Sequence, residues 1–287
     1  MRVGRSGLGP TEDHMAGTIH IGTSGWSYAD WVGPFYPAGT PQARYLAEYA
    51  RTFSAVEVDS TFYRIPTERM VDGWARATPP AFRFAPKFPQ VITHEKRLQG
   101  CEAERDLFLA RMERLGERQG PLVLQFDYTF RYEEHHLLEA FLRGLPPGRR
   151  YAVEVRHRGW LRDEFYAMLE RCGAALVLHD LHYMPKLDRA TADFVFVRLL
   201  GKRSLVPDDF SRARIDRAKD LDAWAEKVRI FADRGLEVFV FANNRYQGHA
   251  PATCRDLAQR LGIALTAPGA PLGLFDPPPT APGDRSP

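Results

Sequence analysis

Eight short apolar segments recur along the chain, and no other feature of the sequence restricts the fold as strongly. Each has five to eight residues and is rich in β-branched or aromatic side chains, which is typical of a strand. They are residues 19–25, 55–61, 82–88, 122–126, 151–156, 174–180, 194–201 and 237–244. Because strands that alternate with helices form parallel sheets, this pattern predicts an α/β fold.

The segments between the strands have a helical pattern, with one exception. Thr40 and Pro41 are a typical helix start, a capping side chain followed by proline at the first helical position. Helices are predicted at residues 42–52, 68–77, 102–118, 133–144, 162–173, 221–235 and 250–262. Residues 181–193, the sixth connection, lack a helical period, so we expect a loop there.

Eight such units within about 250 residues favour closure of the sheet into a TIM-barrel-like (β/α)8 barrel. The alternative is a doubly wound open sheet, which would need a ligand site where the strand order reverses. No GxGxxG or Walker-type sequence occurs in the chain to supply one. We therefore expect a single barrel domain over residues 18–265, with a sixth crossover that lacks a regular helix.

Both ends of the chain are expected to be disordered. Residues 1–17 carry charges but lack the apolar stretch of a signal peptide, and Met15 is an alternative first residue. Residues 266–287 are rich in proline and glycine, a composition that does not form a packed core. We therefore expect neither helix nor strand in either segment.

Cysteine usage and charge restrict the class of protein. Cys101, Cys172 and Cys254 lie far apart, so we expect reduced thiols rather than a zinc site or a disulfide framework. No apolar run reaches the roughly 18 residues that a membrane span needs. The net charge of +3 does not by itself demand an anionic partner. The sequence therefore predicts a cytoplasmic protein with no membrane contact.

Polar side chains stand at the carboxyl end of every predicted strand. In strand order they are Ser24 and Trp26, Glu57 and Asp59, Lys87, Gln125, Glu154 and Arg156, His179 and Asp180, Arg198, and Asn243 and Asn244. In a parallel barrel these ends meet at one rim, which is where barrel enzymes have their active sites. Burying unpaired charges near the axis costs several kcal/mol each, so packing alone does not explain this set.

Several motifs, in the same order, resemble those of the YecE-like family, also called domain of unknown function 72. They are "IGTSGWSYADWVGPFYP", "VEVDSTFYRIPT", "FRFAPKFPQVITHEKRL", "YAVEVRHRGWL" and "NNRYQGHAPATC", and the resemblance covers about residues 18–263. It implies a TIM-barrel-like fold. It brings no established reaction, although structural similarity to endonuclease IV and to sugar isomerases has been suggested for the family, which is a fold analogy only.

The chain departs from the commonest family pattern at two strands. The eighth strand ends in "FANN" where an aromatic followed by "FNN" is more usual, and Asp59 stands where asparagine is more usual. The extra negative charge of Asp59 argues against one identical ligand for every member.

Glu57, Glu154 and Lys87 are the predicted catalytic residues. The two glutamates lie on strands nearly across the barrel, as a carboxylate pair for acid–base work or for metal binding would. The structural alternative is an ion network with Lys87 and with Arg156, which shares a strand face with Glu154. The predicted substrate-binding residues are Trp26, Tyr63, Gln125, Arg156, Asp180, Arg198, Asn243, Asn244 and His249. Lys87, Arg156 and Arg198 would hold an anionic group.

The remaining rim residues give weaker signals. Trp31, Phe35 and Tyr36 are expected to pack on one another within the first rim loop. The histidines of "HDLH", residues 179–182, do not have the spacing of a known metal motif. We therefore predict no metal site; if a metal were bound, oxygen-rich ligands would favour magnesium or manganese over zinc.

The sequence thus predicts an enzyme that acts on an anionic, phosphorylated substrate by acid–base chemistry at the rim. Hydrolysis of a phosphoric ester, in nucleic acid or elsewhere, and isomerisation of a sugar phosphate are its two versions. The alternatives are a nucleic-acid-binding barrel without catalysis and a small-molecule sensor. Motifs for a serine or cysteine nucleophile are absent from the chain.

Overall fold

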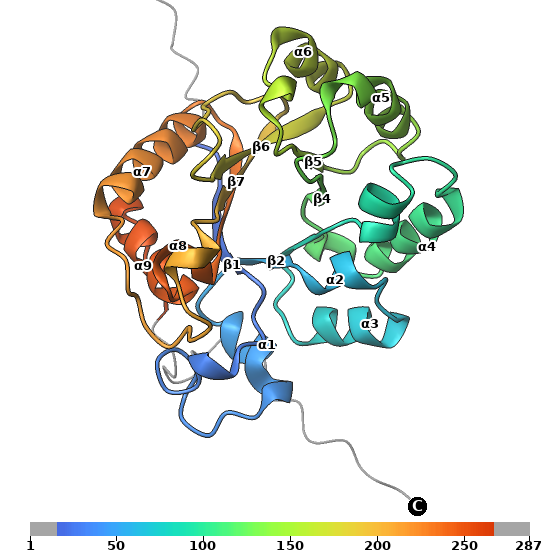
Figure 1. Ribbon diagram of the computed structural model, residues 1–287. Helices are drawn as coiled ribbons and strands as arrows, with labels where there is room; N and C mark the ends of the chain where they lie inside the picture. The colour runs from blue at the N-terminus through green and yellow to red at the C-terminus, as the bar shows by residue number, and fades with distance from the viewer. Residues whose placement is uncertain (1–15, 267–287) are drawn as a thin grey trace, which may run out of the picture.

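The computed structural model describes residues 16–266, which form a parallel eight-stranded barrel surrounded by helices (Figure 1). The strands are β1 (Ile19–Ser24), β2 (Ala55–Val58), β3 (Arg83–Pro86), β4 (Leu122–Gln125), β5 (Tyr151–Glu154), β6 (Ala174–Asp180), β7 (Phe194–Leu199) and β8 (Glu237–Ala242). All eight predicted strands are confirmed.

The pairing of the strands distinguishes the barrel from an open sheet. The order is β3-β2-β1-β8-β7-β6-β5-β4, and β1 pairs with both β2 and β8. The terminal strands β3 and β4 meet through isolated bridges, Phe84 with Gln119 and Lys87 with Val123. The Phe88 amide also donates to the Val123 carbonyl at 2.9 Å. The TIM-barrel-like fold is therefore confirmed, with its weakest join between β3 and β4.

Six of the seven predicted helices are confirmed with small changes of length. The α-helices are α1 (Tyr45–Tyr49), α2 (Ser60–Tyr63), α3 (Glu68–Arg76), α4 (Glu102–Glu113), α5 (His135–Arg143), α6 (Asp163–Arg171), α7 (Ala218–Asp233), α8 (Asn244–Gln247) and α9 (Ala250–Leu261). The sixth connection, residues 181–193, contains no helix, as predicted. Figure 1 shows the longer helices as a ring around the strands.

The first helix is the exception, because the prediction of one continuous helix over residues 42–52 was wrong. Residues 42–44 form a 3-10 turn and only α1 is α-helical. Thr40 does not cap a helix, since its Oγ1 donates to the Pro37 carbonyl at 2.7 Å. The short helix delivers Tyr49, whose hydroxyl donates to the Ala55 carbonyl at 2.9 Å. Tyr49 thereby ties this segment to β2.

The interior of the barrel is filled by alternate residues of the strands. Its core is Ala55, Ala85, Val123, Ala152, Ala175, Val177, Phe194, Phe196, Phe239 and Phe241. Four alanines from β2, β3, β5 and β6 share this core with four phenylalanines from β7 and β8, so small and large side chains complement one another. These residues, the apolar plug, fill the barrel directly beneath the polar residues at the carboxyl ends of the strands.

The predicted disordered ends fall almost entirely outside the described residues, since residues 1–15, Met15 included, and 267–287 are not described. None of the helices in residues 16–266 is long and apolar enough to cross a membrane.

Candidate active site

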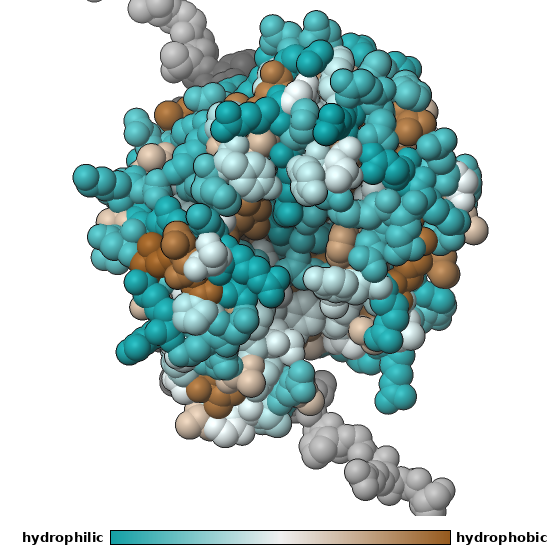
Figure 2. Space-filling model, viewed as in Figure 1, coloured by the Kyte–Doolittle hydropathy of each residue, from teal (hydrophilic) through white to brown (hydrophobic). Residues whose placement is uncertain are grey.

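One polar side chain from each strand or from the residue that follows it lies in a layer at the carboxyl end of the barrel, and seven of the eight lie two positions beyond a residue of the apolar plug. Because side chains of a strand alternate between two faces, a residue two positions after an inward-facing one also faces inward. The layer consists of Ser24, Glu57, Lys87, Gln125, Glu154, His179, Arg198 and Asn243. Figure 2 shows the end with α2 and α8, where the surface is hollowed over the middle of the barrel and lined mainly by hydrophilic residues.

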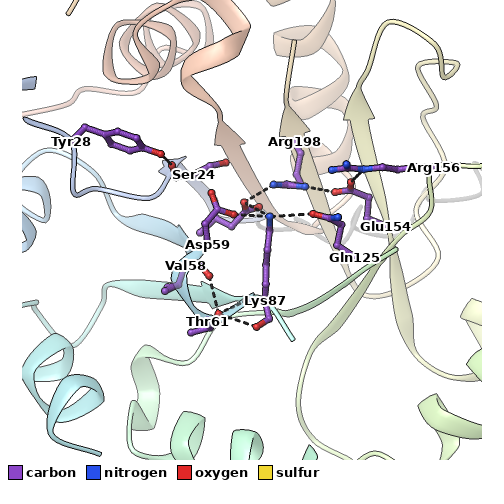
Figure 3. A network of polar contacts seen from close by, with 11 residues as sticks. Ser24, Tyr28, Val58, Asp59, Thr61, Lys87, Gln125, Glu154, Arg156 and Arg198 are labelled. Carbon is purple, nitrogen blue, oxygen red and sulfur yellow. Dashed lines mark hydrogen bonds and ion pairs between the residues drawn. The ribbon is translucent and has the colours of Figure 1, made fainter. Parts of the chain in front are cut away.

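Arg198 on β7 joins the two predicted catalytic glutamates (Figure 3). Its Nη2 donates to Oε1 of Glu57 at 2.6 Å, and its Nη1 donates to Oε2 of Glu154. Both carboxyl groups are fully buried. Burial would lower the pKa of the Arg198 guanidinium, but Glu154 and then Glu57 outweigh burial and raise it. Arg198 therefore stays charged.

Lys87 on β3 makes the second set of contacts. Its Nζ lies 2.6 Å from Oδ1 of Asp59 and 3.6 Å from Oε1 of Glu57. Nζ also donates to Oε1 of Gln125 at 3.2 Å, across the join between β3 and β4. Thr61 fixes the base of this side chain, because its Oγ1 accepts from the Lys87 amide at 3.0 Å. Lys87 thus links β2, β3 and β4.

Glu154 is held as a carboxylate. Nε of Arg156 donates to its Oε1 at 2.7 Å, while Arg198 occupies Oε2. Burial would raise the pKa of Glu154, but Arg198 and then Arg156 hold it well below its usual range. Both oxygens are engaged, so this glutamate orients the two arginines.

Glu57 and Asp59 have environments that push their pKa values apart. Burial raises the pKa of Glu57; Arg198 and Lys87 oppose the rise, and the charge of Asp59 adds to it. The pKa of Asp59 is lowered: burial acts against this, but Lys87 and Arg198 outweigh it. The Asp59 side chain is 30% exposed and that of Glu57 is 0% exposed. Asp59 is therefore the accessible member of the pair.

Several buried atoms of the layer have no hydrogen-bonding partner within residues 16–266. They are Oε2 of Glu57, Nε of Arg198, Oγ of Ser24 and Nδ1 of His179. The other ring nitrogen of His179 lies 3.2 Å from the Val155 carbonyl, which leaves Nδ1 as an acceptor. Buried polar groups are normally paired, so these four atoms are free to bind water or a ligand at the rim.

Asp180 and Asn244 were both predicted to bind substrate. Each lies an odd number of positions from an inward-facing residue, so their side chains point outward to the helices. Oδ2 of Asp180 accepts from Nε1 of Trp224 at 2.9 Å and from the Tyr246 hydroxyl at 3.1 Å. Oδ1 of Asn244 accepts from the Ala250 amide at 2.9 Å at the start of α9. Oδ2 of Asp180 also lies 3.0 Å from Nζ of Lys186 in the connection after β6. The contacts of the two residues are thus with α7, α8, α9 and this connection and not with the polar layer.

Replacing Asp180 by alanine is expected to destabilise the fold without changing the polar layer. The substitution leaves Nε1 of Trp224 and the Tyr246 hydroxyl buried without an acceptor, which costs about 1–3 kcal/mol. Thermal unfolding checks this, with Asp193→Ala in the same half of the barrel as the control. An unchanged melting temperature would contradict the role that we assign to Asp180.

The other predicted binding residues lie around the layer. Asn243 faces it, but its Oδ1 accepts from the Arg245 amide at 2.9 Å. The Nδ1 of His249 lies 2.7 Å from the Phe210 carbonyl, and the ring is buried against Trp31. These contacts give both residues a local structural role.

The aromatic residues of the rim differ in exposure. Trp26 packs edge-on against Trp74, with ring centroids 5.7 Å apart. Tyr63 is 72% exposed at the end of α2. Trp31, Phe35 and Tyr36 are almost fully buried and contact one another, which confirms that the first rim loop packs on itself.

Sequence reasoning did not select Asp59, Ser24 or His179 as site residues. The signal that could have found them is the alternation of side chains along a strand. Each of the three residues lies an even number of positions from an inward-facing residue and therefore also faces inward. Asp59 follows Glu57 by two positions, and His179 follows Val177 by two. Within residues 16–266 no three histidine, cysteine, aspartate or glutamate side chains are grouped so that they could hold a metal ion.

Two curated relatives are similar to the chain in sequence. The UPF0759 protein YunF of Bacillus subtilis (strain 168) is 25% identical over 276 residues, which cover 85% of this chain and 95% of that protein. The UPF0759 protein YecE of Escherichia coli (strain K12) is 39% identical over 139 residues. That match covers 48% of each protein, so the chain spans about half the length of this relative.

Solved structures carry the same fold. A DUF72 family protein from Thermotoga maritima MSB8 is 28% identical with a TM-score of 0.73, covering 85% of this chain and 99% of that one. A DUF72 family protein from Enterococcus faecalis V583 is 23% identical with a TM-score of 0.71, covering 90% and 100%. Residues 20–275 match the family described as protein of unknown function DUF72. The chain therefore belongs to the DUF72 family.

Proposed function

We propose that the protein is an enzyme that transfers protons to and from an anionic, phosphorylated substrate at the carboxyl-terminal rim of the barrel. One observation carries the proposal: the carboxyl groups of Glu57 and Asp59 share Lys87 and have pKa values shifted in opposite directions. A pair of acids whose environments separate their pKa values is the arrangement that acid–base catalysis uses.

The two acids have different positions in the proposed reaction. Asp59 reaches the surface and touches the substrate, while Glu57 below it exchanges the proton with Asp59 and keeps it out of bulk water. Lys87 lies between them and stabilises negative charge that develops on the substrate. Glu154 acts through Arg156 and Arg198, whose orientation it fixes, and is a positioning residue.

The anionic group of the substrate is assigned to Arg156. Its side chain is 27% exposed, and only its Nε is bonded to Glu154, which leaves the outer edge of the guanidinium available. Arg198 is 2% exposed and holds two carboxylates, so it contributes charge from below rather than direct contact. A planar guanidinium edge suits phosphate oxygens.

Both versions of the reaction return the acid pair to its starting state. In hydrolysis, the water oxygen bonds to phosphorus, the bond from phosphorus to the alcohol oxygen breaks, and the pair accepts the water proton and gives one to the alcohol. In isomerisation of a sugar phosphate, the pair takes a proton from one carbon and delivers it to the neighbouring carbon. Either version needs a positioned acid and base and no covalent intermediate.

A substrate screen with a matched pair of variants tests the proposal. The probes are p-nitrophenyl phosphate, bis(p-nitrophenyl) phosphate and a hexose phosphate, followed by colour or by NMR. Glu57→Gln is expected to lose turnover. Glu237→Gln is expected to keep it, because Glu237 lies at the opposite end of the barrel, where its Oε1 is 2.8 Å from Nε2 of His20.

Full activity of Glu57→Gln would refute the assignment. Ligand-dependent stabilisation without turnover in the same screen would favour the small-molecule sensor instead. Binding of DNA or RNA that weakens steeply with salt, again without turnover, would favour the non-catalytic nucleic-acid-binding barrel.

A further inference from the structure

The exposed aromatic side chains of the molecule gather at the rim that carries the polar layer. Six large hydrophobic side chains are exposed within residues 16–266, and three of them are aromatic. These three are Tyr63, Tyr128 and Tyr183, exposed by 72%, 68% and 38%. They lie in the segments that follow β2, β4 and β6, so the exposed aromatic side chains of residues 16–266 stand on the same end of the barrel.

Tyr63 belongs to an aromatic group beside Lys87. Its ring is edge-on to Phe62 at 5.3 Å, and Phe62 is edge-on to His94 at 5.0 Å. Nζ of Lys87 lies 5.9 Å from the centre of the Phe62 ring. Tyr63 also lies near enough to Tyr28 to help raise the pKa of that residue, after burial, Asp59 and Glu57. This group therefore borders the acid pair.

Tyr183 stands on the other side of the layer. Its backbone carbonyl accepts from Nε of Arg158 at 2.9 Å, and its ring is edge-on to His182 at 5.0 Å. Burial raises its pKa, while the nearby Arg156 and Glu154 shift it in opposite directions. Tyr63 and Tyr183 thus flank the polar layer, one beside Lys87 and the other beside Arg156.

Exposed cations lie in two of the segments at the same end of the barrel. Arg64 follows Tyr63 directly, and Lys202, Arg203 and Arg212 lie in the segment after β7. None of the four makes an ion pair with a carboxylate of residues 16–266. The rim therefore carries flat aromatic faces and exposed positive charge at the same end of the barrel.

We infer that the substrate is a single-stranded nucleic acid whose bases stack on Tyr63, Tyr128 and Tyr183. Exposed aromatic rings and exposed cations on the same rim suit the bases and the phosphates of an unpaired strand. A duplex hides the faces of its bases, and a sugar phosphate offers no flat ring to three separate tyrosines. The inference rests on the proposed function. Of its two versions, it selects hydrolysis of a phosphoric ester, here the phosphodiester bond of a nucleic acid.

Binding of a fluorescent oligothymidylate, followed by anisotropy, tests the inference. The comparison ligand is an abasic strand of the same length, which keeps the phosphates and lacks the bases. The protein is expected to bind the oligothymidylate more tightly. Tyr63→Ala and Tyr183→Ala are each expected to weaken its binding by about 5- to 150-fold and to leave abasic binding unchanged.

Ile230→Ala is the matched control, because Ile230 is 52% exposed on α7 and is remote from the rim. Thermal unfolding of each variant shows that a loss of binding is not a loss of fold. The inference is overturned if the abasic strand binds as tightly as the oligothymidylate, or if the tyrosine variants bind like the wild type.

The design separates this inference from the proposed function. Tyrosine-dependent binding in a protein whose Glu57→Gln variant keeps full turnover would refute the acid–base assignment alone. Turnover of phosphate esters that requires Glu57, together with binding that ignores the tyrosines, would refute the choice of nucleic acid alone.

Discussion

Replacing Arg198 by methionine is expected to lower the free energy of unfolding by about 3–5 kcal/mol, because it leaves buried carboxylates without their cation. Glu57 and Glu154 are both 0% exposed, and each loses a hydrogen bond to the guanidinium. For a domain of this size the melting temperature should fall by roughly 6–20 °C. Thermal and urea unfolding measure the effect.

The pH dependence of Arg198→Met provides a signature that simple loss of packing does not share. In the wild type the pKa of Glu154 is held low, so its contribution to stability is present above about pH 4 and is lost as the pH falls. Without Arg198 the buried carboxyl groups would have raised pKa values, and stability would be lost as the pH rises. The difference in the free energy of unfolding between the wild type and Arg198→Met should therefore become smaller at acidic pH.

Two further variants complete the comparison. The triple variant Glu57→Gln, Glu154→Gln, Arg198→Met removes the three buried charges together and leaves only the partly exposed Arg156 without its carboxylate, so it should recover much of the lost stability. Arg114→Met, which breaks a surface pair with Asp72, should change little. Equal stability of Arg198→Met and Arg114→Met would show that water reaches the carboxylates of the polar layer despite their burial.

Replacing Glu57 by glutamine is expected to reduce kcat by about 100- to 10,000-fold, the range that a positioned acid or base contributes. Glutamine keeps the size of the side chain and an oxygen for Arg198, so KM should change much less than kcat. Steady-state kinetics on whichever probe is turned over gives both constants. A rise in KM with kcat unchanged would point to altered binding rather than to proton transfer.

Asp59→Asn tests the coupling between the two acids. The charge of Asp59 contributes to the raised pKa of Glu57, so its removal should lower that pKa. Carboxyl ¹³C NMR measures the titration directly, with Glu237 as an internal reference at the far end of the barrel. A pKa of Glu57 that stays the same or rises would contradict the proposed pairing.

The fold could be predicted from the sequence because its signals are local. Each strand is a short run of β-branched and aromatic residues, and most helices carry an amphipathic period. The first helix escaped prediction because tertiary contacts determine its length: Thr40 bonds back to Pro37, and Tyr49 ends α1 where it can reach β2. Neither contact leaves a periodic pattern in the sequence.

The site could be predicted only in part, because its composition depends on which face of a strand each residue occupies. Glu57, Lys87 and Arg198 were expected, and they do lie together. Asp180 and Asn244 were expected with them but have the opposite parity and contact helices. The bridging of two glutamates by one guanidinium could not be foreseen, since it depends on side-chain reach across three strands.

The join between β3 and β4 has a mechanical consequence. The other neighbouring strands are paired along their length, whereas these two touch at isolated bridges. Lys87, at the end of β3, donates a hydrogen bond to Gln125 at the end of β4. A ligand that binds the Lys87 ammonium would compete with its hydrogen bond to Gln125, which connects β3 and β4. We therefore expect binding at the rim to loosen the contact between β3 and β4.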